Sequence, residues 1–224
     1  KAGLVPYCNI YSSFLQRAYD NIIHDVALPR LHVVFCIDRA GIVGNDGATH
    51  HGLLDLAYLR PIPNMVIGAP MTGEDLEQML VLAKDYDGPI AIRYPRGRVS
   101  EGDEAMRRLG DEAKVTIGKG VCLRAVNVGE AVKRVAVLSI GAIGNTVAEA
   151  IGLLGERGEV KGESVAHYDM RWLKPLDEEL LHEVGSRYSR IVTVEDGVIN
   201  GGLGSAVMEW MNDHGYSVRV TRLG

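Results

Sequence analysis

A glycine-rich stretch in the first quarter of the chain carries residue types that bind anions and move protons. Arg39 lies near its start, and Asp46, His50 and His51 follow within the sequence DRAGIVGNDGATHHG. An arginine guanidinium binds phosphate or carboxylate through two parallel hydrogen bonds, a histidine transfers protons near neutral pH, and glycines let backbone N–H groups approach a ligand closely. These residues predict a site for a small phosphorylated or carboxylated substrate that needs proton transfer.

Two further segments are expected beside this loop. The sequence RYPRG follows one predicted strand, and the sequence IYSSF lies at the end of another. In an open α/β sheet, ligands bind at the carboxyl ends of the strands. If the sheet is parallel, the three segments meet on one rim, which would gather the side chains of Tyr11, Phe14, Arg39, His50, His51, Arg93 and Arg96.

Less specific interpretations of the same residues remain open. Arginines after strands are often surface ion pairs, and glycine-rich loops are often only turns. Asp46 either orients a neighbouring histidine or makes an Asx turn. A metal site at His50 and His51 is not favoured, because adjacent side chains point apart and no cluster of cysteines or carboxylates at ligand spacing accompanies them.

Other polar residues are assigned no chemistry. His167, His182 and His214 look isolated in the sequence. The run NGGLGS at 200–205 lacks the spacing of a dinucleotide-binding glycine motif, so a tight strand-to-helix turn is the favoured interpretation. We expect Glu195 and Asp196 to lie in a solvated or interface loop.

Strands alternating with helices over both halves predict an α/β fold of two doubly wound, mostly parallel-sheet units. Thr72 is expected to cap the helix that follows it. A charged stretch at 99–114 is the expected linker between a first unit at 1–98 and a second unit at 115–224. The expected strands are 4–11, 32–37, 64–70, 88–97, 118–125, 133–140, 163–170, 190–196 and 217–222, and the expected helices are 12–28, 53–60, 73–86, 143–158, 178–188 and 204–215.

Composition argues against several functional classes. The 224 residues carry a net charge of -5, which is not the basic footprint of a nucleic-acid binder. No apolar run approaches membrane-spanning length, and no signal-peptide pattern opens the chain. Its three scattered cysteines argue against a disulfide framework and against a zinc knuckle, so a reducing, cytoplasmic location is expected.

Several segments together closely resemble the 1-deoxy-D-xylulose-5-phosphate synthases, a family of transketolase-like thiamine diphosphate enzymes. They are YSSFLQRAYDNIIHDVAL, FCIDRAGIVGNDGATHHGLLDLAYLRPIPNMVIGAP, IRYPRG, DMRWLKPLDEELL and VTVEDGVINGGLGS. The resemblance spans nearly the whole chain. It is most specific in the glycine-rich loop and in RYPRG, whereas the second unit is similar to the C-terminal domain of transketolase-like enzymes in general.

The resemblance implies a cofactor and a reaction. Enzymes of this family use thiamine diphosphate with Mg²⁺, decarboxylate pyruvate and join the two-carbon unit to glyceraldehyde 3-phosphate. This transferase reaction makes 1-deoxy-D-xylulose 5-phosphate for isoprenoid, thiamine and pyridoxal precursors. The family forms homodimers of three-domain chains.

The resemblance also implies roles for individual residues. Phe14 matches the residue that stacks on the aminopyrimidine ring of the cofactor, and Arg17 lies near that ring. The positions of Tyr11, Arg39 and Arg96 match residues that hold the acceptor and its phosphate. Asp46 and His50 match residues that line the substrate pocket, with His50 placed for proton transfer, and the resemblance gives His51 no role.

The same comparison implies parts that this sequence does not contain. The family's diphosphate-binding domain, with its Mg²⁺ motif, and the glutamate that activates the aminopyrimidine match nothing between Lys1 and Gly224. We therefore expect the incomplete pyrimidine-binding domain and most of the C-terminal domain of a longer protein, without activity on its own.

Two rival interpretations remain. The beta subunit of a thiamine-dependent 2-oxoacid dehydrogenase combines the same two domains on a separate chain. Alternatively, the chain is a non-catalytic dimerisation or regulatory module, which would bind neither thiamine diphosphate nor glyceraldehyde 3-phosphate.

Overall fold

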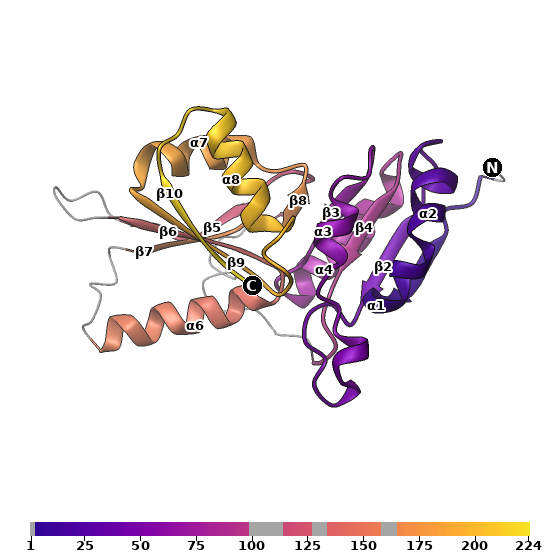
Figure 1. The fold of residues 1–224 in the computed structure, drawn as a ribbon, viewed down its shortest axis with the longest axis horizontal. Helices are drawn as coiled ribbons and strands as arrows, with labels where there is room; N and C mark the ends of the chain where they lie inside the picture. Colours follow the sequence, from indigo (N-terminus) through magenta and orange to yellow (C-terminus); the bar gives the residue numbers. More distant parts are fainter. Residues whose placement is uncertain (1–2, 99–113, 127–133, 158–164) are drawn as a thin grey trace.

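In the computed structural model, the chain forms two α/β halves, each built on a five-stranded sheet (Figure 1). The structure describes residues 3–98, 114–126, 134–157 and 165–224. The linker expected at 99–114 lies outside the described residues except for Lys114. The mixture of mostly parallel strands with interleaved helices confirms the predicted fold class. The predicted boundaries of the two units stay a prediction.

The first sheet has the strand order β1-β2-β4-β3-β8. Its first four members run parallel, whereas β8 pairs antiparallel with β3. The apolar run of β2 is buried on both faces, as a central parallel strand requires. The five strands are β1 (Tyr7–Tyr11), β2 (Val34–Asp38), β3 (Val66–Gly68), β4 (Ile90–Arg93) and β8 (Trp172–Lys174).

Helices cover both faces of this sheet. A helical segment from Ser12 to Ala27 packs on one face together with α3 (Asp55–Leu59), and α4 (Gly73–Asp85) packs on the other. The segment changes geometry along its length instead of forming the single regular helix predicted at 12–28. It consists of α1 (Ser12–Leu15), the 3₁₀ turn η1 (Gln16–Ala18), α2 (Tyr19–Asn21) and the π-helical η2 (Ile22–Ala27).

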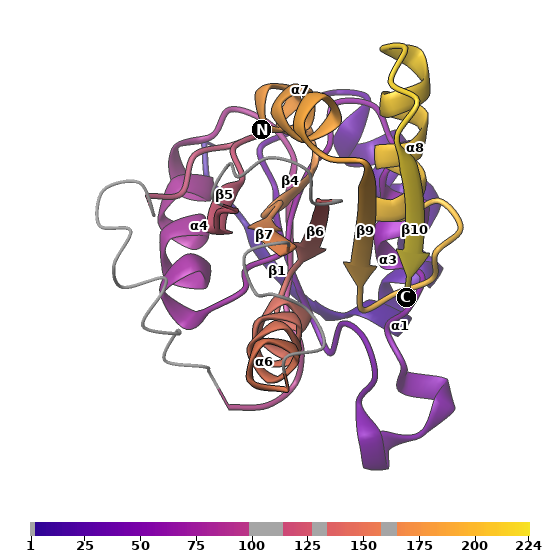
Figure 2. The ribbon, with the colours of Figure 1, turned by 90° about the vertical axis from the view of Figure 1, so that its left-hand side faces the viewer.

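The second sheet has the order β10-β9-β6-β7-β5, with only β5 antiparallel. Its helix α6 packs on one face, and α7 and α8 pack on the other (Figure 2). Its strands are β5 (Val121–Arg124), β6 (Val135–Ile140), β7 (Val165–Asp169), β9 (Arg190–Glu195) and β10 (Arg219–Leu223). Its helices are α6 (Ile143–Glu156), α7 (Glu178–Arg187) and α8 (Leu203–Asp213).

The two halves are joined by a strand that passes from one sheet to the other and by buried charged side chains. Strand β8 follows β7 in the chain but belongs to the first sheet. Just before it, the buried guanidinium of Arg171 donates to Asp75 at the start of α4, with Nη2 and Oδ1 2.9 Å apart. One apolar cluster contains residues of both sheets, so the halves share a core.

Candidate active site

The carboxyl ends of three parallel strands bring the predicted site segments to one edge. Tyr11 at the end of β1 is aligned with Asp38 at the end of β2, and Ile37 of β2 is aligned with Arg93 of β4. The glycine-rich loop leaves β2 at Arg39, which adopts a left-handed backbone conformation with φ 54°. In Figure 1 this loop is the purple segment below the first sheet, next to α1.

Aromatic and cationic side chains pack against one another at this edge. The rings of Tyr11 and Phe14 stack with centroids 5.0 Å apart, and the guanidinium carbon of Arg39 lies 3.9 Å from the Tyr11 ring centroid. Arg17 lies over Phe14 at 5.5 Å, and the His50 ring meets Phe14 edge-on at 5.5 Å. Phe14 nevertheless keeps 37% of its surface exposed, which leaves it accessible to another ring.

Asp46 lies between two arginines. Its Oδ2 accepts from Arg39 Nε at 3.2 Å, and its Oδ1 accepts from Arg96 Nη1 at 2.6 Å. Burial alone would raise the pKa of Asp46, but the hydrogen bonds and charges of Arg96 and Arg39 outweigh it and hold the pKa below its usual value. The carboxylate therefore stays charged and orients both guanidinium groups.

The structure thus brings Tyr11, Arg39, His50 and Arg96 into one cluster of contacting side chains. Tyr11 touches Arg39, which shares Asp46 with Arg96, and Phe14 links Tyr11 to His50. Arg96 bonds only through Nη1 to the part of the chain that the structure describes, so its other nitrogens are available to an anionic ligand.

The two adjacent histidines face different surroundings. His50 lies beside Phe14, and its Nδ1 is 3.0 Å from the Thr49 hydroxyl oxygen. His51 turns into the loop, where its Nδ1 accepts the backbone N–H of Val43 at 3.2 Å. His51 therefore helps to hold the loop, a role that the sequence did not reveal because it depends on which way the ring turns.

The loop closes on itself at its two ends. Gly41 and Gly52 exchange backbone hydrogen bonds of 2.8 Å in both directions. A side chain at Gly52 would overlap the carbonyl of Arg39 and the side chain of Ser12. The glycine here is needed for close approach of backbone segments, and the closed base presents Arg39, Asp46 and His50 together.

Arg93 does not belong to the rim, contrary to the sequence prediction. Its side chain is buried, and its Nε donates to Asp55 Oδ2 at 3.0 Å. Its Nη2 donates to the carbonyls of Gly52 at 3.3 Å and Asp196 at 2.8 Å. Arg93 is the last residue of β4 and points into the protein, whereas Arg96 lies three residues further on in the exposed turn.

Of the two strand-end residues of the second half, Glu195 differs from expectation, whereas Asp196 lies between the halves. Glu195 is 2% exposed, not solvated, and its carboxylate accepts the N–H groups of Leu203 and Gly204 at 2.8 and 2.9 Å. The Glu195 carboxylate therefore caps the N-terminus of α8, which agrees with a strand-to-helix turn at 200–205. Asp196 is half-buried, and its carboxylate packs against Gly41 in the glycine-rich loop.

The three histidines expected to be isolated all have neighbours. His167 is buried, and its Nε2 is 2.8 Å from the Ser139 hydroxyl oxygen. His214 stacks on Trp210 with ring centroids 4.0 Å apart, and His182 packs edge-on against both rings. His167 thus joins β7 to β6, whereas His182 joins α7 to the end of α8, and both contacts are remote in the chain from the rim.

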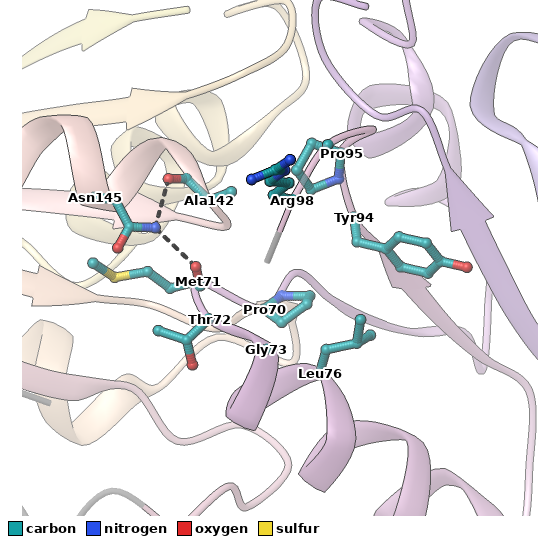
Figure 3. Close-up of a pocket in the computed structure, with 11 residues that line it drawn as sticks. Pro70, Met71, Thr72, Gly73, Leu76, Tyr94, Pro95, Arg98, Ala142 and Asn145 are labelled. Atoms are coloured by element: carbon teal, nitrogen blue, oxygen red, sulfur yellow. Dashed lines mark hydrogen bonds between the residues drawn. The ribbon is translucent and has the colours of Figure 1, made fainter. Parts of the chain in front are cut away.

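A cavity of about 420 Å³ between the halves was not predicted (Figure 3). One wall is the turn from Pro70 to the start of α4, and another is the start of α6, where Asn145 Nδ2 donates to the Met71 carbonyl at 2.9 Å. Pro95 and Arg98 line it beside the RYPRG turn. Its walls come from both halves, so a single segment of sequence could not indicate it.

Within the described ranges, no group of three or more His, Cys, Asp and Glu side chains is arranged to hold a metal ion. No helix in those ranges is both long enough and apolar enough to cross a bilayer.

Two family models match the chain. "Transketolase, pyrimidine binding domain" matches residues 1–101, and "Transketolase, C-terminal domain" matches residues 125–224. A solved structure described as "Split gene transketolase, inactive beta4 tetramer" superposes with a TM-score of 0.82 at 28% identity, covering 98% of this chain and 66% of that one.

Curated relatives are similar over the full length of the chain. The 1-deoxy-D-xylulose-5-phosphate synthases of Parabacteroides distasonis and Bacteroides fragilis are 55% and 54% identical over 226 aligned residues that include 100% of the chain. The synthase of Caldanaerobacter subterraneus subsp. tengcongensis is 42% identical over 99% of it. The chain spans about a third of the length of each of these relatives.

Proposed function

We propose that the chain, which belongs to the transketolase family and contains its pyrimidine-binding and C-terminal domains, forms part of a 1-deoxy-D-xylulose-5-phosphate synthase. The whole enzyme would decarboxylate pyruvate and transfer the two-carbon unit to glyceraldehyde 3-phosphate. Synthases that are 49–55% identical over the chain support this assignment.

The observation that carries the proposal is the pair of arginines around Asp46, beside Tyr11. Arg39 and Arg96 reach the same carboxylate from two different loops, so their donors converge on one small region. Converging guanidinium groups bind a phosphate monoester better than a neutral sugar. In this proposal Tyr11, Arg39 and Arg96 hold the acceptor phosphate.

Asp46 and His50 would act on the remainder of the substrate. Asp46 keeps both arginines oriented, and His50 lies on the Phe14 side of the cluster, where it would move protons during addition to the aldehyde. The alternatives that the sequence left open for Asp46 are replaced here by a third, which is pairing with the two arginines.

The described residues fit the organic part of thiamine diphosphate. Phe14 presents an exposed aromatic surface for the aminopyrimidine ring, and Arg17 lies beside that ring surface. When bound, the cofactor supplies the carbanion chemistry that no amino-acid side chain provides. We propose that Mg²⁺ and the diphosphate are held by the remainder of the longer protein, and that the active enzyme is a homodimer.

A chimeric synthase tests the proposal. The homologous third of the Parabacteroides distasonis enzyme is replaced by this chain, and formation of 1-deoxy-D-xylulose 5-phosphate from pyruvate and glyceraldehyde 3-phosphate is measured. The chimera is expected to turn over and the isolated chain is not. An inactive but folded, thiamine-binding chimera would contradict the assignment.

The same chimera separates the two rivals. A 2-oxoacid dehydrogenase beta subunit would support reductive acylation of a lipoyl domain instead of condensation with the phosphorylated aldehyde. A non-catalytic module would bind neither thiamine diphosphate nor glyceraldehyde 3-phosphate. Calorimetric titration of the chimera with each ligand would then show no binding.

A further inference from the structure

The glycine-rich loop is anchored by the segment that follows β9 in the second half. Near the start of the loop, Gly41 packs directly against the Asp196 carboxylate. Just beyond its end, the carbonyl of Leu53 accepts the N–H of Val198 at 2.9 Å. A side chain at Gly41 would overlap the Asp196 carboxylate, so loop and anchor are in direct contact.

Arg93 connects the same anchor to the other arm of the site. Its guanidinium donates to the carbonyls of Asp196 and Gly52 and to the carboxylate of Asp55. That carboxylate also accepts the hydroxyl of Ser12 at 3.1 Å, and Ser12 directly follows Tyr11. One buried guanidinium therefore joins the loop, the Tyr11 segment and the second half.

We propose that Asp196, together with Arg93, is a positioning residue of the anion site: it fixes the glycine-rich loop so that Arg39 and Asp46 meet Arg96 and Tyr11. Neither side chain has a hydrogen bond or ring contact with Tyr11, Arg96 or His50 in the described part of the chain. The identity of the ligand rests on the proposed function, whereas the anchoring does not.

The physical reason is the conformational freedom of the loop. Gly41, Gly44 and Gly47 all adopt positive φ values, so the backbone would otherwise have many conformations of similar energy. The backbone hydrogen bonds between Gly41 and Gly52 and from Val198 to Leu53, with the packing of Asp196 on Gly41, restrict that freedom before any ligand binds. Preorganisation of this kind raises affinity because less conformational freedom is lost on binding.

A matched pair of variants tests the inference on the chain itself. Asp196→Ala removes the side chain that packs against Gly41, whereas Asp196→Asn keeps a side chain of the same shape in its place. Hydrogen exchange of the backbone amides at 41–52 is expected to be about five- to tenfold faster in Asp196→Ala and within about twofold of the parent in Asp196→Asn. Asp87→Ala, an exposed site in the turn before β4, controls for the loss of a carboxylate.

Steady-state kinetics of the chimeric synthase give the second readout. In the chimeric synthase, the KM for glyceraldehyde 3-phosphate is expected to rise about tenfold in Asp196→Ala and to be restored in Asp196→Asn, with kcat changed less. Unchanged loop exchange in a folded Asp196→Ala variant would overturn the inference.

If Asp196→Ala does not fold, the parent protein still tests the anchoring of the loop. Its Val198 amide, which donates to the Leu53 carbonyl, is expected to exchange more slowly than the Asn45 amide in the loop, and equal, unprotected exchange at both would refute the anchoring. A parent chimera that makes no product would count against the proposed function alone, because amide exchange needs no substrate.

Discussion

At the residue scale, the two arginines of the sequence RYPRG differ in what surrounds them. Arg93 is buried against Asp55, whose side chain is fully buried, while Arg96 is half exposed and shares Asp46 with Arg39. A buried pair that loses one partner leaves an uncompensated charge, whereas a partly exposed pair is screened by water.

Arg93→Met is therefore expected to lower the free energy of unfolding by about 3 kcal/mol or more, because the Asp55 carboxylate loses its buried partner. Arg96→Met is the matched control and is expected to cost less than about 1 kcal/mol, because its pair with Asp46 is partly exposed. Urea unfolding of both variants checks this. Equal losses of unfolding free energy in the two variants would show that Arg93 contributes no more to stability than the control arginine.

The sequence predicted which side chains gather at the rim but not the surroundings of each one. Tyr11, Arg39 and Arg96 were expected on one rim because parallel strands end at the same edge, and the aligned ends of β1, β2 and β4 have this arrangement. The burial of Arg93 and the inward turn of His51 depend on strand register and ring orientation. No pattern of residue types along the chain encodes these.

At the element scale, Thr72 starts α4 with a capping box. Its hydroxyl accepts the N–H of Asp75 at 3.1 Å, and the Asp75 carboxylate accepts the N–H of Thr72 at 3.2 Å. The Thr-x-x-Asp spacing predicted this cap from the sequence. What it could not predict is that the same Asp75 binds Arg171 from the second half.

Thr72→Ala is expected to destabilise the protein by about 1 kcal/mol, because the first turn of α4 loses a buried hydrogen-bond acceptor. Thr72→Ser keeps the hydroxyl and is expected to stay within about 0.5 kcal/mol of the parent. Thermal unfolding of both variants measures the difference. An equal loss in the serine variant would point to the threonine methyl group, not the cap.

Local patterns predicted most of the described elements, including the short β3, whereas β8 was not predicted. Apolar runs identified β2, β4, β6 and β9, and capping and periodicity identified α4 and α7. Strand β8 is only three residues long, and its partner β3 lies about a hundred residues earlier in the chain. Pairing over that separation leaves no local signal.

At the scale of the whole molecule, the two halves are expected to unfold together. They share an apolar cluster, strand β8 and ion pairs that include Arg171 with Asp75 and Arg60 with Glu209. The chain has two tryptophans, with Trp172 in the first sheet and Trp210 on α8 of the second half.

In a Trp210→Phe variant, the fluorescence of Trp172 reports the first sheet. Its midpoint in urea is expected to coincide with the midpoint of far-ultraviolet circular dichroism, which reports both halves. Separate midpoints would mean that the halves unfold independently, and that the contacts between them contribute little.

Stability is expected to fall in acid through His167. Burial lowers the pKa of His167 to about 4, so the folded state keeps it neutral while the unfolded chain takes up a proton below about pH 6.5. Unfolding therefore becomes easier as the pH falls from about 6.5 to about 4, by up to about 3 kcal/mol.

His167→Gln removes this proton uptake, so the unfolding free energy is expected to fall less steeply as the pH is lowered. The measurement is the change in free energy of unfolding between about pH 7 and about pH 5, compared with the parent. Burial and the nearby Asp75 raise the pKa of Asp169 to about 7, which acts in the opposite direction. Asp169 is present in both proteins, so the difference isolates His167, and identical pH profiles would contradict the assignment.

The central claim is that Arg39 and Arg96 bind the phosphate of the acceptor aldehyde. In the chimeric synthase, kcat/KM is measured for Arg96→Ala and the parent with glyceraldehyde 3-phosphate and with unphosphorylated glyceraldehyde. The account predicts a loss of about 100-fold with the phosphorylated substrate and less than about threefold with the other. An equal loss with both substrates would contradict it, because the arginine would then serve something other than the phosphate.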